Sequence, residues 1–159
     1  AGSLLIGFLI YGIILAETGG GKFFIDIAES IMGKYRGGPA KVAILASGFF
    51  GMLSGSPTSN VITSGSLTIP AMKKAGYPGR YAAAIEACAS TGGVLMPPVM
   101  GTVAFIMASF LNLPYAEILL AALIPGAIFY IALIIQTDLY AAKNKLLGMI
   151  KINIQILYI

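Results

Sequence analysis

Two short runs of small polar residues interrupt an otherwise apolar sequence, and their residue types suit the binding of ions. The first run, residues 54–60, reads Ser-Gly-Ser-Pro-Thr-Ser-Asn, and the second, residues 90–93, reads Ser-Thr-Gly-Gly. A helix that breaks at such a run exposes carbonyl oxygens at one end and N–H groups at the other. Hydroxyl and carbonyl oxygens suit a hard cation such as sodium, and N–H groups suit a carboxylate. Two facing breaks can therefore hold a cation between them.

The alternative is that these small residues serve helix packing, because small side chains let membrane helices approach closely. We interpret residues 64–66 (Ser-Gly-Ser) and 82–84 (three alanines) in that way. Residues 54–60 combine a proline with more polar and small positions than packing requires, which favours a binding role. For residues 90–93 both interpretations stay open.

Glu86 lies four residues before the second run, inside the apolar stretch 82–89. A carboxylate at membrane depth is costly, so it is a candidate functional group. Glu86 is also only six residues after Arg80, so that it could instead pair with Arg80 or extend to the membrane interface. The sequence does not decide between these two interpretations.

The composition indicates an integral membrane protein with a mean hydropathy of +0.91. Of the 159 residues, 10% are charged, whereas a soluble domain carries about 25%. Histidine is absent and Cys88 is the single cysteine, which excludes an intrachain disulfide, a Cys/His transition-metal site and Ser–His catalysis. The net charge of +4 is explained by membrane topology, so we expect no nucleic-acid partner and no cofactor besides a coupling ion.

The predicted fold class is all-α: a polytopic membrane protein with a re-entrant helical hairpin and a broken transmembrane helix. Two apolar arms, 42–53 and 61–72, are each about 12 residues long, whereas a span needs about 20. Uncoiled backbone persists at membrane depth only when it is buried in protein or lines a wet cavity. We therefore predict a hairpin with an uncoiled polar tip at residues 54–60, followed by an unwound break at residues 90–93 and Pro97-Pro98.

These elements belong to a membrane domain that we predict over residues 1–144. Its parts are the end of a transmembrane helix (1–16), an amphipathic interfacial helix (22–36), the re-entrant hairpin (39–75), a broken transmembrane helix (79–111) and a transmembrane helix (116–137). Because the chain starts inside an apolar run, we expect a fragment cut within its first helix. We assign no role to the tail, residues 145–159.

The basic residues favour a hairpin that enters and leaves on one face of the membrane. They are Lys22, Lys34, Arg36 and Lys41 before the hairpin, Lys73, Lys74 and Arg80 after it, and Lys143 and Lys145 after the last span. If the hairpin returns to the face it entered from, all of these residues lie in the cytoplasm, as the positive-inside rule requires.

Two other classes compete with a transporter. A pore with a re-entrant filter would use the same elements. An intramembrane serine hydrolase would use Ser54 as its nucleophile, but the chain has no histidine to act as the base.

Several motifs resemble the large membrane subunit of TRAP transporters, the DctM-like permeases. They are residues 48–60 (GFFGMLSGSPTSN), 65–70 (GSLTIP), 72–77 (MKKAGY) and 82–98 (AAAIEACASTGGVLMPP). The glutamate and the Ser-Thr-Gly-Gly run are most similar to the fused permeases of the TAXI branch. The resemblance covers most of residues 1–143, but only the N-terminal one of the two inverted repeats that such a permease has.

The resemblance implies sodium-coupled uptake of a small organic acid, often a carboxylate, by an elevator-type mechanism in the inner membrane. It implies as partners a periplasmic solute-binding protein, the remaining permease repeat and a small membrane subunit or its fused equivalent. The sodium- and substrate-binding residues that it implies are Ser54, Gly55, Ser56 and Asn60 at the hairpin tip, with Ser90, Thr91, Gly92 and Gly93 at the break.

Overall fold

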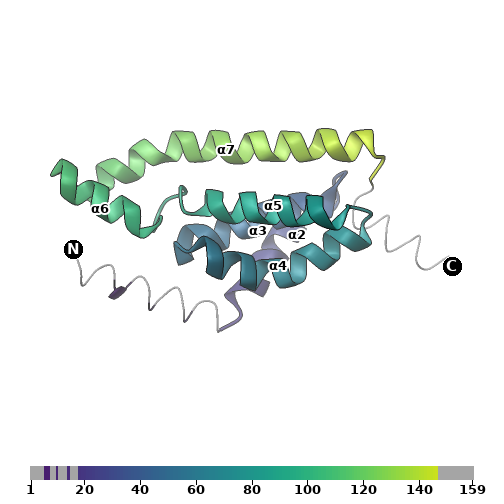
Figure 1. Cartoon of the computed structure of the whole chain (residues 1–159), viewed down its shortest axis with the longest axis horizontal. Helices are drawn as coiled ribbons and strands as arrows, with labels where there is room; N and C mark the ends of the chain where they lie inside the picture. Colours follow the sequence, from purple (N-terminus) through teal and green to yellow (C-terminus); the bar gives the residue numbers. More distant parts are fainter. Residues whose placement is uncertain (1–5, 8–9, 11–13, 15–17, 147–159) are drawn as a thin grey trace.

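The computed structural model describes residues 6–7, 10, 14 and 18–146. Its helices are α2 (Gly20–Met32), α3 (Gly38–Ser54), α4 (Pro57–Lys74), α5 (Gly79–Gly93), α6 (Thr102–Leu111) and α7 (Tyr115–Lys143) (Figure 1). The described residues contain no strand, which confirms the all-α class. The predicted helix end at 1–16 and the tail at 145–159 lie almost entirely outside the described residues.

α3 and α4 form a helical hairpin whose arms are longer than the sequence predicted. Only Gly55 and Ser56 separate them, because Ser54 ends α3 and Pro57 begins α4. The prediction that residues 54–60 are uncoiled is therefore wrong for most of that run. Proline is tolerated in the first turn of a helix, where its missing N–H would have no partner. The Ser56 side chain then caps α4 by accepting a hydrogen bond from the Ser59 N–H (3.3 Å).

The second break is only partly where the sequence predicted it: the broken helix runs over 79–111 and includes Pro97-Pro98 in its break, but the break begins later. Helix α5 continues through Gly93, so residues 90–93 are helical, and the non-helical segment is residues 94–101. Pro97 and Pro98 lie in this segment, where neither residue can donate a backbone hydrogen bond. Near its end Met100 adopts the left-handed conformation (φ 57°), and Gly101 then caps α6.

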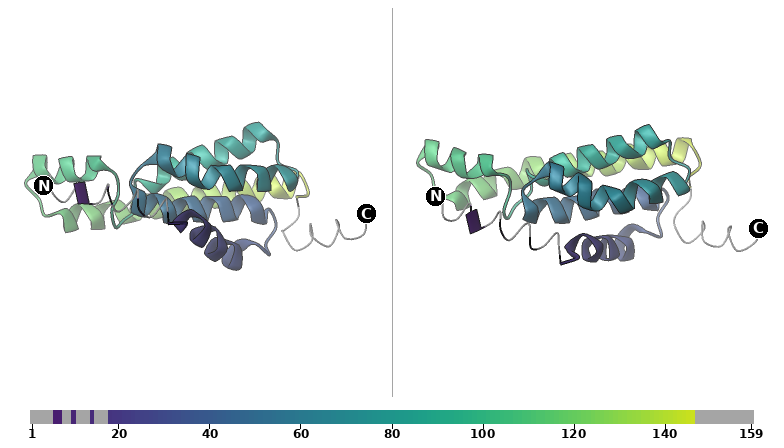
Figure 2. Two further views of the ribbon diagram at one scale, coloured as in Figure 1. Left: turned by 90° about the horizontal axis from the view of Figure 1, so that it is seen from below. Right: turned by 60° about the horizontal axis from the view of Figure 1, so that its bottom comes forward.

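Helix α3 lies at the centre of the bundle. Figure 2 shows α2 on one side of α3 and the pair α4 and α5 on the other. On the α2 side, Ala28 is buried against Val42 and Ala46 of α3. The helix predicted at 22–36 therefore ends earlier, at Met32, and packs on protein along one face, while Phe23 remains exposed. Whether α2 lies at a membrane interface stays a prediction.

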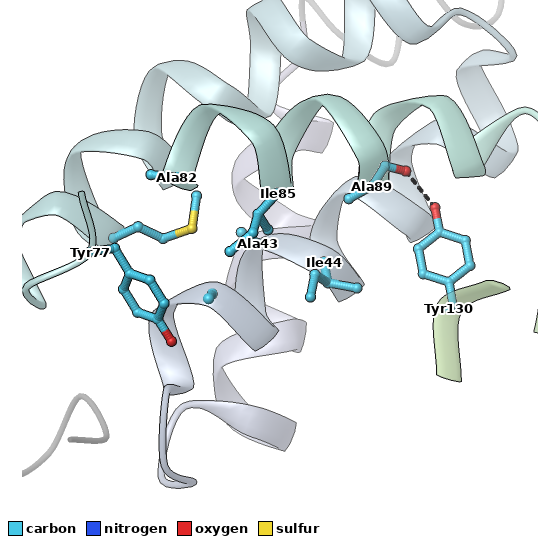
Figure 3. Close-up of a cluster of buried hydrophobic side chains, with 9 residues drawn as sticks. Ala43, Ile44, Tyr77, Ala82, Ile85, Ala89 and Tyr130 are labelled. Atoms are coloured by element: carbon cyan, nitrogen blue, oxygen red, sulfur yellow. Dashed lines mark hydrogen bonds between the residues drawn. The ribbon is translucent and has the colours of Figure 1, made fainter. Parts of the chain in front are cut away.

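The main apolar core joins α3, α5 and α7. The buried residues shown in Figure 3 include Ile44 of α3, Ile85 and Ala89 of α5, and Tyr130 of α7. The Tyr130 hydroxyl donates a hydrogen bond to the Ala89 carbonyl oxygen (2.6 Å), so the polar end of this ring is satisfied inside the core. A smaller cluster of Met100, Ala104 and Ile118 joins α6 to the start of α7.

Among the described residues, α7 is the one helix that is long and apolar enough to cross a membrane. It contains 29 residues, includes the predicted span 116–137 and continues through Pro125. Large apolar side chains such as Leu120, Ile124 and Leu139 are exposed along it. Helices α3 and α6 are apolar but shorter.

A charged cluster attaches the end of α7 to the start of α3. The Asp138 carboxylate on α7 accepts hydrogen bonds from Arg36 and from Lys41, whose Nζ lies 2.5 Å from Asp138 Oδ1. The Lys41 side chain is only 9% exposed, so its ammonium group depends on this carboxylate for a partner.

Glycines let α5 lie directly against its neighbours. A Cβ added at Gly93 would be 2.7 Å from the Gly51 Cα on α3, and one added at Gly92 would overlap the Phe129 ring on α7. Small residues at a crossing allow backbones this close, which is the packing role that the sequence left open for residues 90–93. Gly92 and Gly93 therefore pack directly against neighbouring helices, and their part in an ion site stays a prediction.

This packing predicts that Gly93→Ala destabilises the protein even though alanine is the better helix former. The new methyl group meets the α3 backbone, which cannot move aside as a flexible side chain can, so we expect a loss of about 1–3 kcal/mol. Gly79→Ala, in the same helix, is the control, because its Cβ would meet only the Lys73 side chain at 3.7 Å. Thermal unfolding of the purified protein measures both, and equal midpoints for the two variants would contradict the close contact.

Candidate functional site

A fully buried carboxylate lies where α3, α4 and α5 meet. Glu86 of α5 is 0% exposed, and hydroxyl groups from all three helices surround it. Its Oε1 accepts hydrogen bonds from Ser47 Oγ (2.6 Å), Ser64 Oγ (2.5 Å) and Ser90 Oγ (3.3 Å), and its Oε2 accepts one from Thr68 Oγ1 (2.6 Å). We call these four residues the hydroxyl cluster.

Asn60 extends the hydroxyl cluster toward the hairpin tip. Its Nδ2 donates to the Ser47 carbonyl oxygen (2.7 Å), and its Oδ1 lies 3.0 Å from Ser64 Oγ. Asn60 is fully buried, so α3 and α4 are held together by polar bonds that water does not reach. The amide that was predicted as an ion ligand at the tip is therefore already occupied with the cluster around Glu86.

The helical repeat explains why these residues meet. Asn60, Ser64 and Thr68 follow one another at a spacing of four, which places them on one face of α4. Gly65 lies beside this face, and a Cβ there would be 3.1 Å from Glu86 Cγ. The interpretation of Ser64 as a packing residue is thus wrong, whereas Gly65 does permit the close approach of Glu86.

No cation balances Glu86 in the described part of the chain. Between residues 18 and 146 the ion pairs are those of Asp138 with Arg36 and Lys41. Arg80 is exposed and forms neither a hydrogen bond nor an ion pair with Glu86, so the interpretation that Glu86 pairs with it or reaches the surface is wrong. An ionisable residue inside a membrane protein is by default a candidate functional group, and Glu86 remains one.

A second group of oxygens lies where the hairpin tip meets the segment 94–101. A Cβ added at Gly55 would overlap the Met100 carbonyl oxygen, and one added at Gly101 would lie 3.5 Å from the Gly55 carbonyl oxygen. The Val99 N–H donates to the Met52 carbonyl oxygen (3.1 Å) and fixes this contact. Gly55 adopts the left-handed conformation (φ 63°), which lets the chain turn within two residues.

Ser54, the residue before Gly55, has an unpartnered side-chain oxygen. Ser54 is 6% exposed, and its Oγ has no hydrogen-bond partner, whereas most buried hydroxyls in folded proteins have one. We call Ser54, Gly55 and Met100 the tip contact. Hydroxyl and carbonyl oxygens are the ligands that hard cations take.

The residues predicted as one site therefore divide between two places. Ser54, Gly55 and Ser56 lie at the hairpin tip, whereas Asn60 and Ser90 belong to the surroundings of Glu86. The other three residues of the run 90–93 make no side-chain contact with either place. Gly92 and Gly93 pack against neighbouring helices. Thr91 is exposed, and its hydroxyl donates to the Ala87 carbonyl oxygen (2.8 Å).

The sequence analysis missed Ser47, Thr68 and Met100 as members of these two groups. The polar spacing of four along α4 was a signal that could have identified Thr68. Ser47 is isolated in an apolar helix, and Met100 contributes a backbone atom, so neither residue type gives a sequence signal.

The chain matches a family described as "Tripartite ATP-independent periplasmic transporter, DctM component" over residues 2–155. It is 31% identical over 148 residues to the C4-dicarboxylate TRAP transporter large permease protein DctM of Pseudomonas aeruginosa, covering 93% of this chain and 34% of that protein. It is 29% identical to the isethionate TRAP transporter permease protein DctMQ of Oleidesulfovibrio alaskensis over 91% of this chain and 22% of the relative. It is 33% identical to the sialic acid TRAP transporter permease protein SiaT of Haemophilus influenzae over 89% of this chain and 23% of the relative.

The chain thus spans about a third of the first relative and less than a quarter of the other two. The family consists of transporter permeases, which are not enzymes, and this leaves the hydrolase interpretation of Ser54 without support. The family match covers nearly the whole chain and includes the hairpin, the second break and the span that follows. The chain belongs to the DctM family, the large membrane components of tripartite ATP-independent periplasmic transporters.

Proposed function

We propose that the chain forms part of a sodium-coupled secondary transporter that takes up a small organic acid. The relatives are named as permeases for C4-dicarboxylates, isethionate and sialic acid, all of which are organic acids. A periplasmic solute-binding protein would deliver the acid. The remaining permease repeat and a small membrane subunit, or its fused equivalent as in the TAXI branch, would complete the assembly in the inner membrane.

The observation that carries this proposal is the tip contact. Ser54 has a buried hydroxyl without a partner, and the Gly55 and Met100 carbonyl oxygens lie beside the same turn. These oxygens are uncharged and come from two different breaks in the helices. In transporters with discontinuous helices, coupling ions bind oxygens at such breaks. Sodium needs such oxygens, and no carboxylate is required.

The positions of the basic residues are compatible with a re-entrant hairpin whose two ends lie on the same face of the membrane. The arms have 17 and 18 residues, close to the length of a span, so the support comes from the basic residues and not from arm length. Lys73 and Lys74 lie in the last turn of α4, while Lys41 lies near the start of α3. Both basic ends would therefore lie on the cytoplasmic side, with the tip contact deep in the membrane. Movement of the hairpin with α5 as one body would then carry the ion across, as an elevator mechanism requires.

Ser54→Ala in the complete permease is expected to raise the sodium concentration for half-maximal uptake. Loss of one oxygen ligand is expected to cost about 1–2 kcal/mol, which corresponds to roughly a 5–30-fold change. Thr91→Ala is the matched control, because that hydroxyl is exposed and bonded within its own helix. Uptake into proteoliposomes at graded sodium concentrations measures the effect, and an unchanged sodium dependence of Ser54→Ala would remove the tip contact as a sodium site.

Uptake is also expected to depend on the solute-binding protein. Purified permease in liposomes should accumulate the organic acid only when the binding protein is added, because the acid is delivered in bound form. Measuring uptake and electrical conductance on the same preparation separates the two remaining classes. Conductance without the binding protein would favour the pore with a re-entrant filter.

A further inference from the structure

We infer that Glu86 is a proton-binding site, which takes up and releases a proton within the hydroxyl cluster as the transporter works. This inference rests on the proposed transport function and adds a second coupling ion to it. The site is separate from the tip contact, which involves Ser54, Gly55 and Met100 but neither Glu86 nor its partners.

No charged side chain among the described residues contacts Glu86, so no neighbouring cation holds it in the ionised form. The groups that face it are Ser47 from α3, Asn60, Ser64 and Thr68 from α4, and Ser90 from its own helix. From α7 the nearby titratable group is the Tyr130 phenol, which donates to the Ala89 carbonyl oxygen. A structural carboxylate at such a position is expected to have a cationic partner, because an unpaired buried charge is costly.

The geometry favours a proton over a metal ion at this site. Hydroxyl oxygens of Ser47, Ser64 and Thr68 contact the carboxylate oxygens directly at 2.5–2.6 Å. These are hydrogen-bond distances, and they leave no space between the oxygens for an ion that must itself lie about 2.3–2.6 Å from each ligand. A proton needs no additional space.

Ser64 allows both protonation states of Glu86 to keep their hydrogen bonds. Its single hydroxyl proton has four possible acceptors: Glu86 Oε1 (2.5 Å), the Asn60 carbonyl oxygen (2.8 Å), Asn60 Oδ1 (3.0 Å) and Ser47 Oγ (3.1 Å). When Glu86 is ionised, Ser64 donates to it. When a proton binds Oε1, that O–H donates to Ser64 Oγ, and Ser64 turns its own proton to Asn60.

The position of the site gives proton binding a mechanical consequence. The hydroxyl cluster connects α5 to both hairpin arms. A change in the charge of Glu86 therefore changes the hydrogen bonds that hold these three helices together. Thr68 is five residues before Lys73, which is about 7.5 Å along α4 from the basic end of the helix. We expect proton exchange with the side of the membrane on which that end lies.

Infrared difference spectroscopy of the complete permease in liposomes tests proton binding without any substrate. On acidification from neutral pH, wild-type protein should gain the carbonyl stretch of a protonated carboxylic acid in a water-free environment. Glu86→Gln should lose this band, because its amide keeps the shape but cannot titrate. Glu29→Gln, which removes an exposed carboxylate on α2, is the control and should retain it. A band that persists in Glu86→Gln, or that is missing from the wild type, would overturn the inference.

A transport assay tests the same inference functionally. It measures uptake of the organic acid that the solute-binding protein is found to bind. With an inward proton gradient and equal sodium on both sides, wild type and Glu29→Gln should accumulate the acid, while Glu86→Gln falls to the level of empty liposomes. Exchange of labelled for unlabelled acid without a gradient should continue in Glu86→Gln, which shows that it is folded. Wild-type uptake that ignores the proton gradient would refute proton coupling, whereas no wild-type uptake under any gradient would count against the proposed transport function.

Discussion

The burial of the Glu86 carboxylate constrains the whole α3–α4–α5 bundle. An ionised carboxylate in an apolar interior costs far more than any single packing contact returns, unless hydrogen bonds replace its water. Here the replacement comes from Ser47, Ser64 and Thr68, which lie on two other helices. The two hairpin arms and α5 must therefore keep one fixed arrangement, because a shift of any of them leaves the carboxylate partly unsatisfied.

Glycines make that arrangement sterically possible. The contact of Gly93 with Gly51 brings α5 onto α3 one helical turn from Ser47, and Gly65 leaves room for the Glu86 side chain beside α4. A larger residue at any of these positions would separate the helices and lengthen hydrogen bonds that are now 2.5–2.6 Å. The glycines and the hydroxyl cluster thus act together. The glycines let the helices approach closely, and the hydroxyl groups donate hydrogen bonds to Glu86.

The hairpin tip and the second break form a separate polar region at one end of this bundle. The turn at Gly55 and Ser56 is short, and the Val99 N–H bonds to Met52, so the tip is held against the segment that follows α5. Such a contact joins two breaks in the chain that are about forty residues apart, as expected of discontinuous helices in secondary transporters. The two polar regions differ in chemistry: one has neutral oxygens, and the other holds a buried carboxylate.

The sequence by itself determined the helical class, the two interruptions and the membrane character, because these follow from local composition and the length of apolar runs. It also singled out Glu86 as costly. It did not predict where each break begins. Pro57 fits the first turn of α4, so that helix starts earlier than predicted. Helix α5 stays helical through Gly93, and the break that contains Pro97 and Pro98 follows it. Only the tertiary structure decided that Asn60 and Ser90 lie beside Glu86 and that Gly92 and Gly93 lie against Phe129 and Gly51. The reason is that these partners depend on how three helices cross, and a crossing is fixed by contacts between residues distant in the chain.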